Sequence, residues 1–131
     1  MVFKTLIMIN GFEKQTRDLT SEELRALPVL IDGFKKLKGK KQAMTAKSIS
    51  KQMEDHHNIS ISGPRMRKLI NFIRINDKVL FLIATSKGYC VADNEKEIID
   101  YVISLKDRAD SITHVVDCLI EQMKNNENLL K

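Results

Sequence analysis

The sequence predicts a mainly α-helical protein with one small β-hairpin, an α+β fold. Between residues 20 and 78, apolar side chains recur every three or four positions in three successive segments, and a residue that caps helices precedes each segment. From residue 79 the pattern changes to two short strand-like segments around a polar turn. From residue 94 a helical pattern runs without Gly or Pro to about residue 125. We therefore expect three helices, a hairpin and a long helix, in that order.

The first helix is expected to begin after Thr20. Thr20 and Glu23 have the spacing of a capping box, and Leu19 and Leu24 are placed as its hydrophobic staple. Pro28 lies inside the helical pattern, where it removes one backbone donor, so we expect a kink or break just before it. The apolar residues at helical spacing are Leu24, Leu27, Leu30, Ile31 and Phe34.

Two shorter helices are expected to follow. Thr45 caps the first of them, and Asn58 suits a left-handed residue at its end. Ser62 caps the second, Pro64 is tolerated in its first turn, and the helix should stop near residues 76–77. The side chains expected to be buried are Ala46, Ile49 and Met53 on one helix and Met66, Leu69, Ile70 and Ile73 on the other.

The remaining boundaries follow from these elements. Residues 79–84 and 89–91 are expected to form a hairpin with a polar turn at residues 85–88. The first residues of the chain are apolar, but the run is too short to span a bilayer and has no cleavage site of a secretory signal. We expect an N-terminal segment packed on the domain (1–19), a central domain (20–93) and a long C-terminal helix (94–131).

The last helix carries a heptad pattern, expected to begin at Asn94. Its seam consists of Ile98, Val102, Leu105, Ala109, Ile112, Val116, Leu119 and Met123. This pattern favours a parallel two-stranded coiled coil, although the same seam suits packing against the first helix and the apolar N-terminus. We expect the first half of the helix to pack on the domain and the second half to form a homodimer. The side chains assigned to the dimer are Leu105, Ile112, Val116, Leu119 and Met123.

Charge is segregated along the chain. Residues 35–78 contain 12 basic and 3 acidic residues, whereas the segments on either side are net acidic. No acidic residue occurs between Ile59 and Asn76, so pairing within that stretch does not explain its basic side chains. The segregation indicates that one surface meets a polyanion.

Three helices followed by a hairpin is the winged-helix arrangement, and two segments resemble that superfamily. Residues 83–91, Ile-Ala-Thr-Ser-Lys-Gly-Tyr-Cys-Val, look like the wing of biotin-operon-repressor-type domains, where a Gly-Tyr pair follows a polar tip. Thr45-Ala-Lys-Ser-Ile49 resembles the start of their second helix. The resemblance covers roughly residues 20–92 and departs in a longer link at residues 56–62. The whole chain also looks similar to small uncharacterised phage and prophage proteins.

The resemblance implies a helix-turn-helix whose recognition helix, about residues 65–74, enters the major groove. Arginine can contact guanine and asparagine can contact adenine with two hydrogen bonds each. The expected base readers are Arg65, Arg67, Lys68 and Asn71. Arg74 and Lys78 are expected to meet phosphates, and supporting contacts are expected from Lys47, Ser48, Lys51 and Lys87.

Other classes of protein find little support. The sequence has no nucleophile elbow, phosphate-binding loop or dinucleotide-binding glycine pattern, so we expect neither an enzyme nor a cofactor. The tandem pair His56 and His57 points in two directions on a helix, and His114 with Cys118 supplies only two ligands, so no metal site is expected. Two cysteines without CxxC spacing favour a cytoplasmic protein, and no membrane association is expected.

The sequence thus predicts a non-enzymatic protein that binds double-stranded DNA through the recognition helix. The helix that precedes it and the wing are expected to add supporting contacts. Its expected role is a transcriptional regulator or a replication or recombination accessory of phage or prophage type. The alternative is a winged-helix adaptor or assembly factor, whose basic face binds an acidic protein partner. Shape alone does not separate these two functions.

Overall fold

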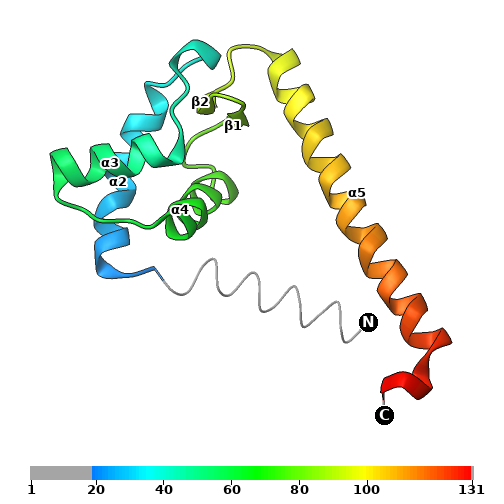
Figure 1. The fold of residues 1–131 in the computed structure, drawn as a ribbon. Coiled ribbons are helices and arrows are strands. Elements are labelled where there is room, and N and C mark those ends of the chain that lie inside the picture. Colours follow the sequence, from blue (N-terminus) through cyan, green and yellow to red (C-terminus); the bar gives the residue numbers. More distant parts are fainter. Residues whose placement is uncertain (1–18, 131) are drawn as a thin grey trace. The chain divides into compact units, whose positions relative to one another are not determined.

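The computed structural model describes residues 19–130, so most of the expected N-terminal segment lies outside the described residues (Figure 1). The chain divides after Asn94 into two compact units. The first is mainly helical with one two-stranded antiparallel hairpin, which confirms the predicted class, and the second contains the long helix. The elements are α2 (Ser21–Lys35), η1 (Lys40–Gln42), α3 (Ala46–His57), α4 (Gly63–Ile75), β1 (Leu82–Thr85), β2 (Gly88–Val91), α5 (Glu95–Asn125) and η2 (Glu127–Leu130).

The caps predicted for the first three helices are confirmed. Thr20 accepts from the backbone N–H of Glu23 at 3.1 Å, and the Glu23 carboxylate accepts from the backbone N–H of Thr20 at 2.8 Å, which completes the capping box of α2. The hydroxyls of Thr45 and Ser62 cap α3 and α4 by accepting from the backbone N–H groups of Ser48 and Arg65, at 3.1 and 3.4 Å. Asn58 ends α3 in the left-handed conformation, with φ 52°.

The predicted break at Pro28 is wrong, because α2 continues through this residue as one α-helix. Proline removes the hydrogen bond that would reach the carbonyl of residue 24. Both Pro28 and Leu24 are exposed, so the carbonyl left without its donor lies on the side of the helix that water can reach. The helix therefore tolerates the proline without breaking.

The buried face of α2 differs from the predicted one. Leu30 and Phe34 are buried as expected, but Leu24 is 55% exposed and does not complete the expected staple within the core. Ala26 and Glu23 are buried on this face instead. The face is therefore rotated from the predicted stripe and includes a carboxylate.

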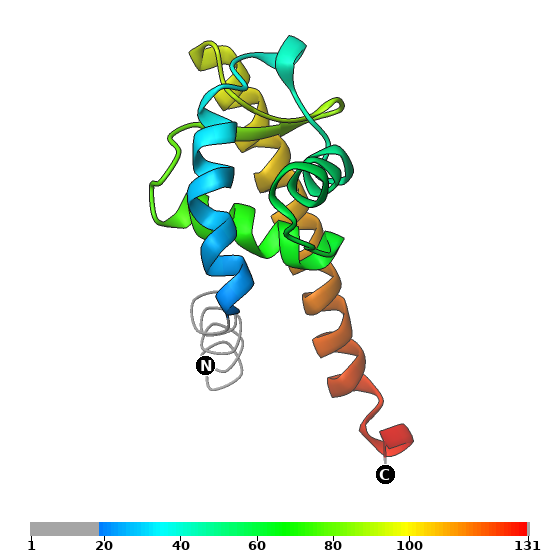
Figure 2. The same cartoon turned by 90° about the vertical axis from the view of Figure 1, so that its left-hand side faces the viewer.

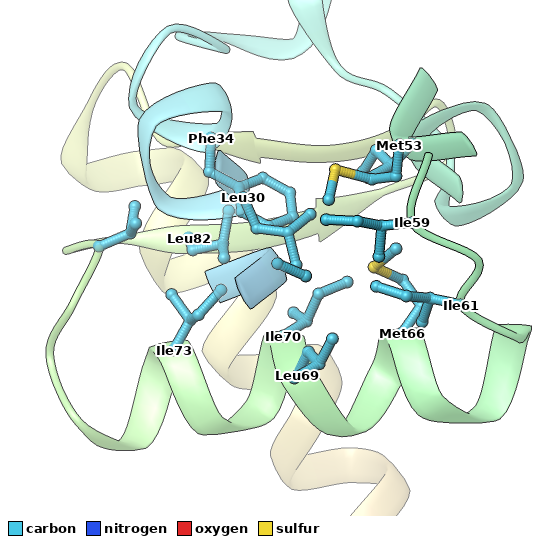
Figure 3. Packing of buried hydrophobic residues seen from close by; sticks show 13 residues of the cluster. Leu30, Phe34, Met53, Ile59, Ile61, Met66, Leu69, Ile70, Ile73 and Leu82 are labelled. Carbon is cyan, nitrogen blue, oxygen red and sulfur yellow. The ribbon is translucent and has the colours of Figure 1, made fainter. Parts of the chain in front are cut away.

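The hydrophobic core lies between α2, α3, α4 and the hairpin. Met66, Leu69, Ile70 and Ile73 of α4 are each no more than 1% exposed. Figure 3 shows these four side chains pointing from α4 toward Leu30 and Leu82, with the hairpin strands behind the core. The other labelled members of the cluster are Phe34, Met53, Ile59 and Ile61.

The hairpin is shorter than predicted and is tied to the rest of the domain. Its strands pair from Leu82 opposite Val91 to Thr85 opposite Gly88, so residues 79–81 lie outside the strands. The link between α2 and α3 adds backbone pairing on the other side of β2. Met44 exchanges two hydrogen bonds with Tyr89, at 2.8 and 3.1 Å, and Lys38 forms a bridge with Val91.

Gly88 allows this close approach. Its φ of +121° is unfavourable for a residue with a Cβ, and a Cβ placed there would lie 2.3 Å from the carbonyl carbon of Met44 and 2.5 Å from the nitrogen of Thr45. Both neighbours are backbone atoms, which cannot move aside as a side chain can. The glycine thus sets the distance between the hairpin turn and the start of α3.

The second unit is dominated by α5, whose 31 residues agree with the predicted long helix. No residue of α5 is buried, and only Glu97, Ile98 and Tyr101 are half-buried. The other apolar side chains along the predicted seam are exposed.

We predict that Gly88→Ala destabilises the domain by about 1–3 kcal/mol, because the new Cβ forces the hairpin away from Met44. Urea unfolding followed by circular dichroism measures the change. Gly33→Ala is the matched control, since a Cβ at Gly33 meets nothing within 4 Å and the residue lies in α2. This control should be neutral or stabilising by up to about 1 kcal/mol. Equal effects of the two substitutions would contradict the role of Gly88.

Candidate nucleic-acid interface

Three parts of the first unit share one side. Figure 2 shows the turn of the hairpin, α3 and the N-terminal end of α4 on the same side of the domain. The contact of Gly88 with Met44 and Thr45 places the hairpin turn against the start of α3. Helix α2 packs on α4 from the core, so it lies behind the outer face of α4.

The N-terminal half of α4 presents three of the predicted side chains. Burial of Met66, Leu69, Ile70 and Ile73 turns the opposite side of the helix outward. Arg67 is exposed, and Lys68 and Asn71 are half-buried. Within residues 19–130 neither Arg67 nor Lys68 takes part in a salt bridge.

The residues predicted to make supporting contacts lie on α3 and in the hairpin turn. Lys47, Ser48 and Lys51 lie exposed on α3, and Lys87 is exposed in the two-residue turn of the hairpin. The Ser48 hydroxyl accepts a hydrogen bond from the Thr45 hydroxyl at 3.1 Å, so part of its capacity is used within the α3 cap. The elements that carry these lysines, α3 and the hairpin turn, lie on the same side of the domain as the N-terminal end of α4 (Figure 2).

Arg65, predicted to read bases, is held by a carboxylate in the structure. Its Nε donates to Oε2 of Glu23 at 2.6 Å, and its second guanidinium nitrogen pairs with Oε1 of the same carboxylate. The Glu23 side chain is 5% exposed and that of Arg65 36%. This pair links the first turn of α2 to the first turn of α4. Arg65 is therefore partly exposed, but its guanidinium group is engaged in an ion pair with Glu23.

The hydrogen bond from Arg65 holds the pKa of Glu23 below its ordinary value of 4.5. Burial of the carboxylate opposes this effect, and the hydrogen bond from the Thr20 backbone adds to it. Glu23 therefore remains ionised at neutral pH inside the edge of the core. Sequence reasoning missed this pair, although an acidic residue one turn before Ala26 and Leu27, in step with the buried stripe, was an available signal.

Arg74 is also directed inward, toward the hairpin. Its Nε donates to the carbonyl of Leu82 at 3.0 Å, and its guanidinium carbon lies 5.6 Å from the centre of the Tyr89 ring. Tyr89 in turn meets Phe34 edge to face, with 6.4 Å between ring centres. Arg74 therefore connects α4 to both strands. Lys78 is exposed but follows the C-cap of α4 at Asn76, away from the N-terminal half of the helix.

The domain also has a groove of about 500 Å³ between α2 and α3. Its lining is mainly apolar, with Leu30, Phe34 and Met53 at its base, and the exposed side chains of His56 and His57 lie beside it. Across residues 19–130 no three or more His, Cys, Asp or Glu side chains gather as a metal site would require. On α5, the Cys118 sulfur lies 3.8 Å from Nε2 of His114 at the surface.

No family model matches this chain, and comparison with curated proteins and with solved structures finds no match either. Among the described residues no helix has the length and apolar character that crossing a bilayer requires.

We predict that Glu23→Gln lowers stability at neutral pH by about 1–3 kcal/mol, because Arg65 loses its charged partner. The folded-state pKa of Glu23 lies below its unfolded value. The ionised carboxylate therefore stabilises the fold fully above pH 4.5, and this contribution is lost as pH falls through the folded-state pKa. Urea titrations of both proteins between neutral pH and acid should show the difference shrinking below pH 4.5. Glu54→Gln, at an exposed carboxylate of α3, is the control, and a difference that persists unchanged in acid would contradict the assignment.

Proposed function

We propose that the first unit is a winged-helix domain that binds double-stranded DNA, with α4 as its recognition helix. The single observation that carries the proposal is that the N-terminal end of α4, α3 and the hairpin turn share one side of the domain (Figure 2) and that all three carry cations. These cations are Arg67, Lys68, Lys47, Lys51 and Lys87, of which Lys68 is half-buried and the others are exposed, and we call them the basic surface. The chain would act without catalysis, as a transcriptional regulator or a replication or recombination accessory.

The arrangement of elements supports the winged-helix assignment. α3 and α4 are consecutive packed helices, as in a helix-turn-helix, although the link at residues 58–62 is longer than the usual turn of three or four residues, and the hairpin is the next element after α4. The pairing of Met44 with Tyr89 anchors the hairpin, so its turn is held beside the start of α3. A wing in this position contacts the DNA backbone beside the groove that α4 would enter.

The chemistry of the basic surface supports DNA as the ligand. Arginine and asparagine on a helix can reach base edges in the major groove, and Arg67 and Asn71 occupy successive turns of α4. Lys47, Lys51 and Lys87 are compact cations suited to phosphates on either side. Arg65 and Arg74 contribute by holding α4 against α2 and the hairpin, which orients the readers rather than replacing them.

We predict that Arg67→Glu weakens binding of duplex DNA by about 5- to 150-fold, because it removes a contact worth about 1–3 kcal/mol. Fluorescence anisotropy with a labelled duplex measures the change. The logarithm of the wild-type affinity should fall with the logarithm of the salt concentration with a slope of about −4.5, if about five cations meet phosphates. Lys87→Ala should lower the magnitude of that slope by about 1 and weaken different duplexes alike.

Lys35→Glu is the charge-matched control for Arg67→Glu. Lys35 is exposed in the last turn of α2, which packs behind α4, and the substitution changes the net charge by the same amount. Equal losses for the two variants would reduce the effect to net charge and contradict a localised surface. Absence of binding by the wild-type chain at about 50 mM salt would overturn the proposal itself.

A second candidate function, the adaptor that binds a protein, is favoured by one specific observation. Ile75, Leu80 and Phe81 are each more than half exposed at the end of α4 and just beyond it, and Phe81 has a positive φ of 61°. Large apolar side chains held outward in this way are typical of protein-binding surfaces. Under this function, Phe81→Ser would abolish partner binding, whereas the DNA-binding function leaves duplex affinity unaffected by this variant.

A further inference from the structure

The apolar seam of α5 is exposed over most of its length. Six large seam side chains are at least 36% exposed, so the structure leaves them accessible to another surface. They are Val102, Leu105, Ile112, Val116, Leu119 and Met123. The helix is 31 residues long and would extend about 46 Å at 1.5 Å per residue. With Ile98 and Ala109 the seam follows the heptad spacing of helices that pack on other helices.

The seam is symmetric about its own midpoint. Its eight positions are separated by alternating steps of four and three residues, and the order of steps is the same from either end. In an antiparallel coiled coil, each a position of the heptad meets a d position of the other helix. A single register then pairs all eight positions. The pairs are Ile98 with Met123, Val102 with Leu119, Leu105 with Val116, and Ala109 with Ile112.

Side-chain volumes favour this register over a parallel one. An antiparallel pair places the small Ala109 opposite the large Ile112, and each valine opposite a leucine. A parallel pair in register would place Ala109 opposite Ala109 of the second copy and leave that layer poorly filled. Because an unfilled layer loses packing contacts, the antiparallel register fills the seam more evenly.

The residues that flank the seam also favour the antiparallel register. The charged side chains that flank it are Lys106 and Arg108, both cations. A parallel pair brings these cations of the two copies to one level. The antiparallel register separates Lys106 of the two copies by nine residues and Arg108 of the two copies by five, about 14 and 8 Å along the axis, which is near the screening length at moderate salt. It also places Ile99 of each copy opposite Ile120 of the other, so two further apolar side chains are covered.

We propose that α5 pairs with α5 of a second copy of this chain as a two-stranded antiparallel coil. This differs from the parallel coil that the residue types at the seam favour, and it uses the whole seam rather than its second half. The inference goes beyond the proposed function and does not depend on DNA binding, because it rests on α5 alone.

Light scattering on the full chain tests the pairing in the absence of DNA. The expected mass is twice that of the 15.0 kDa chain. Ile112→Asp, in the middle of the seam, should yield a monomer that retains its helical circular dichroism. His114→Asp, on the outer side of the same turn, is the matched control and should remain a dimer. A wild-type monomer at the highest soluble concentration, or an assembly larger than two chains, would overturn the proposal.

Disulfide trapping tests the orientation without a destabilising charge. The background is Cys118→Ser, which removes the exposed thiol of α5. One chain carries Val102→Cys and a second, distinguished by a mass tag, carries Leu119→Cys. The antiparallel register predicts that mild oxidation of the mixture links the two different chains and that neither chain links to itself. Self-linked Val102→Cys chains would contradict the antiparallel pair, and neither result bears on the binding of DNA by the first unit.

Discussion

Burial of one face of α4 is the constraint on which the rest of the first unit depends. Met66, Leu69, Ile70 and Ile73 are almost completely inaccessible, and each contributes about 1.5–3 kcal/mol through burial. Because helical residues point in directions set by the 3.6-residue period, this burial also decides where every other side chain of α4 points. The three arginines of α4 consequently make different contacts, although they lie close together in the sequence.

That difference separates orienting cations from accessible ones. Arg65 reaches back to the ionised Glu23 on α2, and Arg74 reaches across to Leu82 and Tyr89 on the hairpin. Each connects α4 to a neighbouring element at one of its ends. Arg67, two turns before Arg74, meets no such partner among the described salt bridges and hydrogen bonds. A charge count along the chain treats all three alike, so it overstates how many cations a polyanion would meet.

Much of the fold could be predicted from the sequence because its signals are local. The caps at Thr20, Thr45 and Ser62 and the left-handed residue at Asn58 depend on neighbours within four residues. The errors arose where a distant partner decides the outcome. Glu23 is buried because Arg65, 42 residues away, neutralises it, and its burial rotates the face of α2 away from Leu24. The extra pairing of Met44 with Tyr89 likewise needs a contact that no local pattern reveals.

The two units also differ in the kind of interaction that their surfaces favour. The basic surface would act through charges, which salt screens and whose counterions are released when phosphates bind. The seam of α5 is apolar, and the outer side of that helix carries the acidic side chains Asp100, Asp107 and Glu121. An apolar seam is insensitive to screening, and an acidic outer side repels a polyanion. The proposed pairing and the proposed DNA binding therefore use surfaces of opposite chemistry, so a rise in salt would weaken one while leaving the other in place.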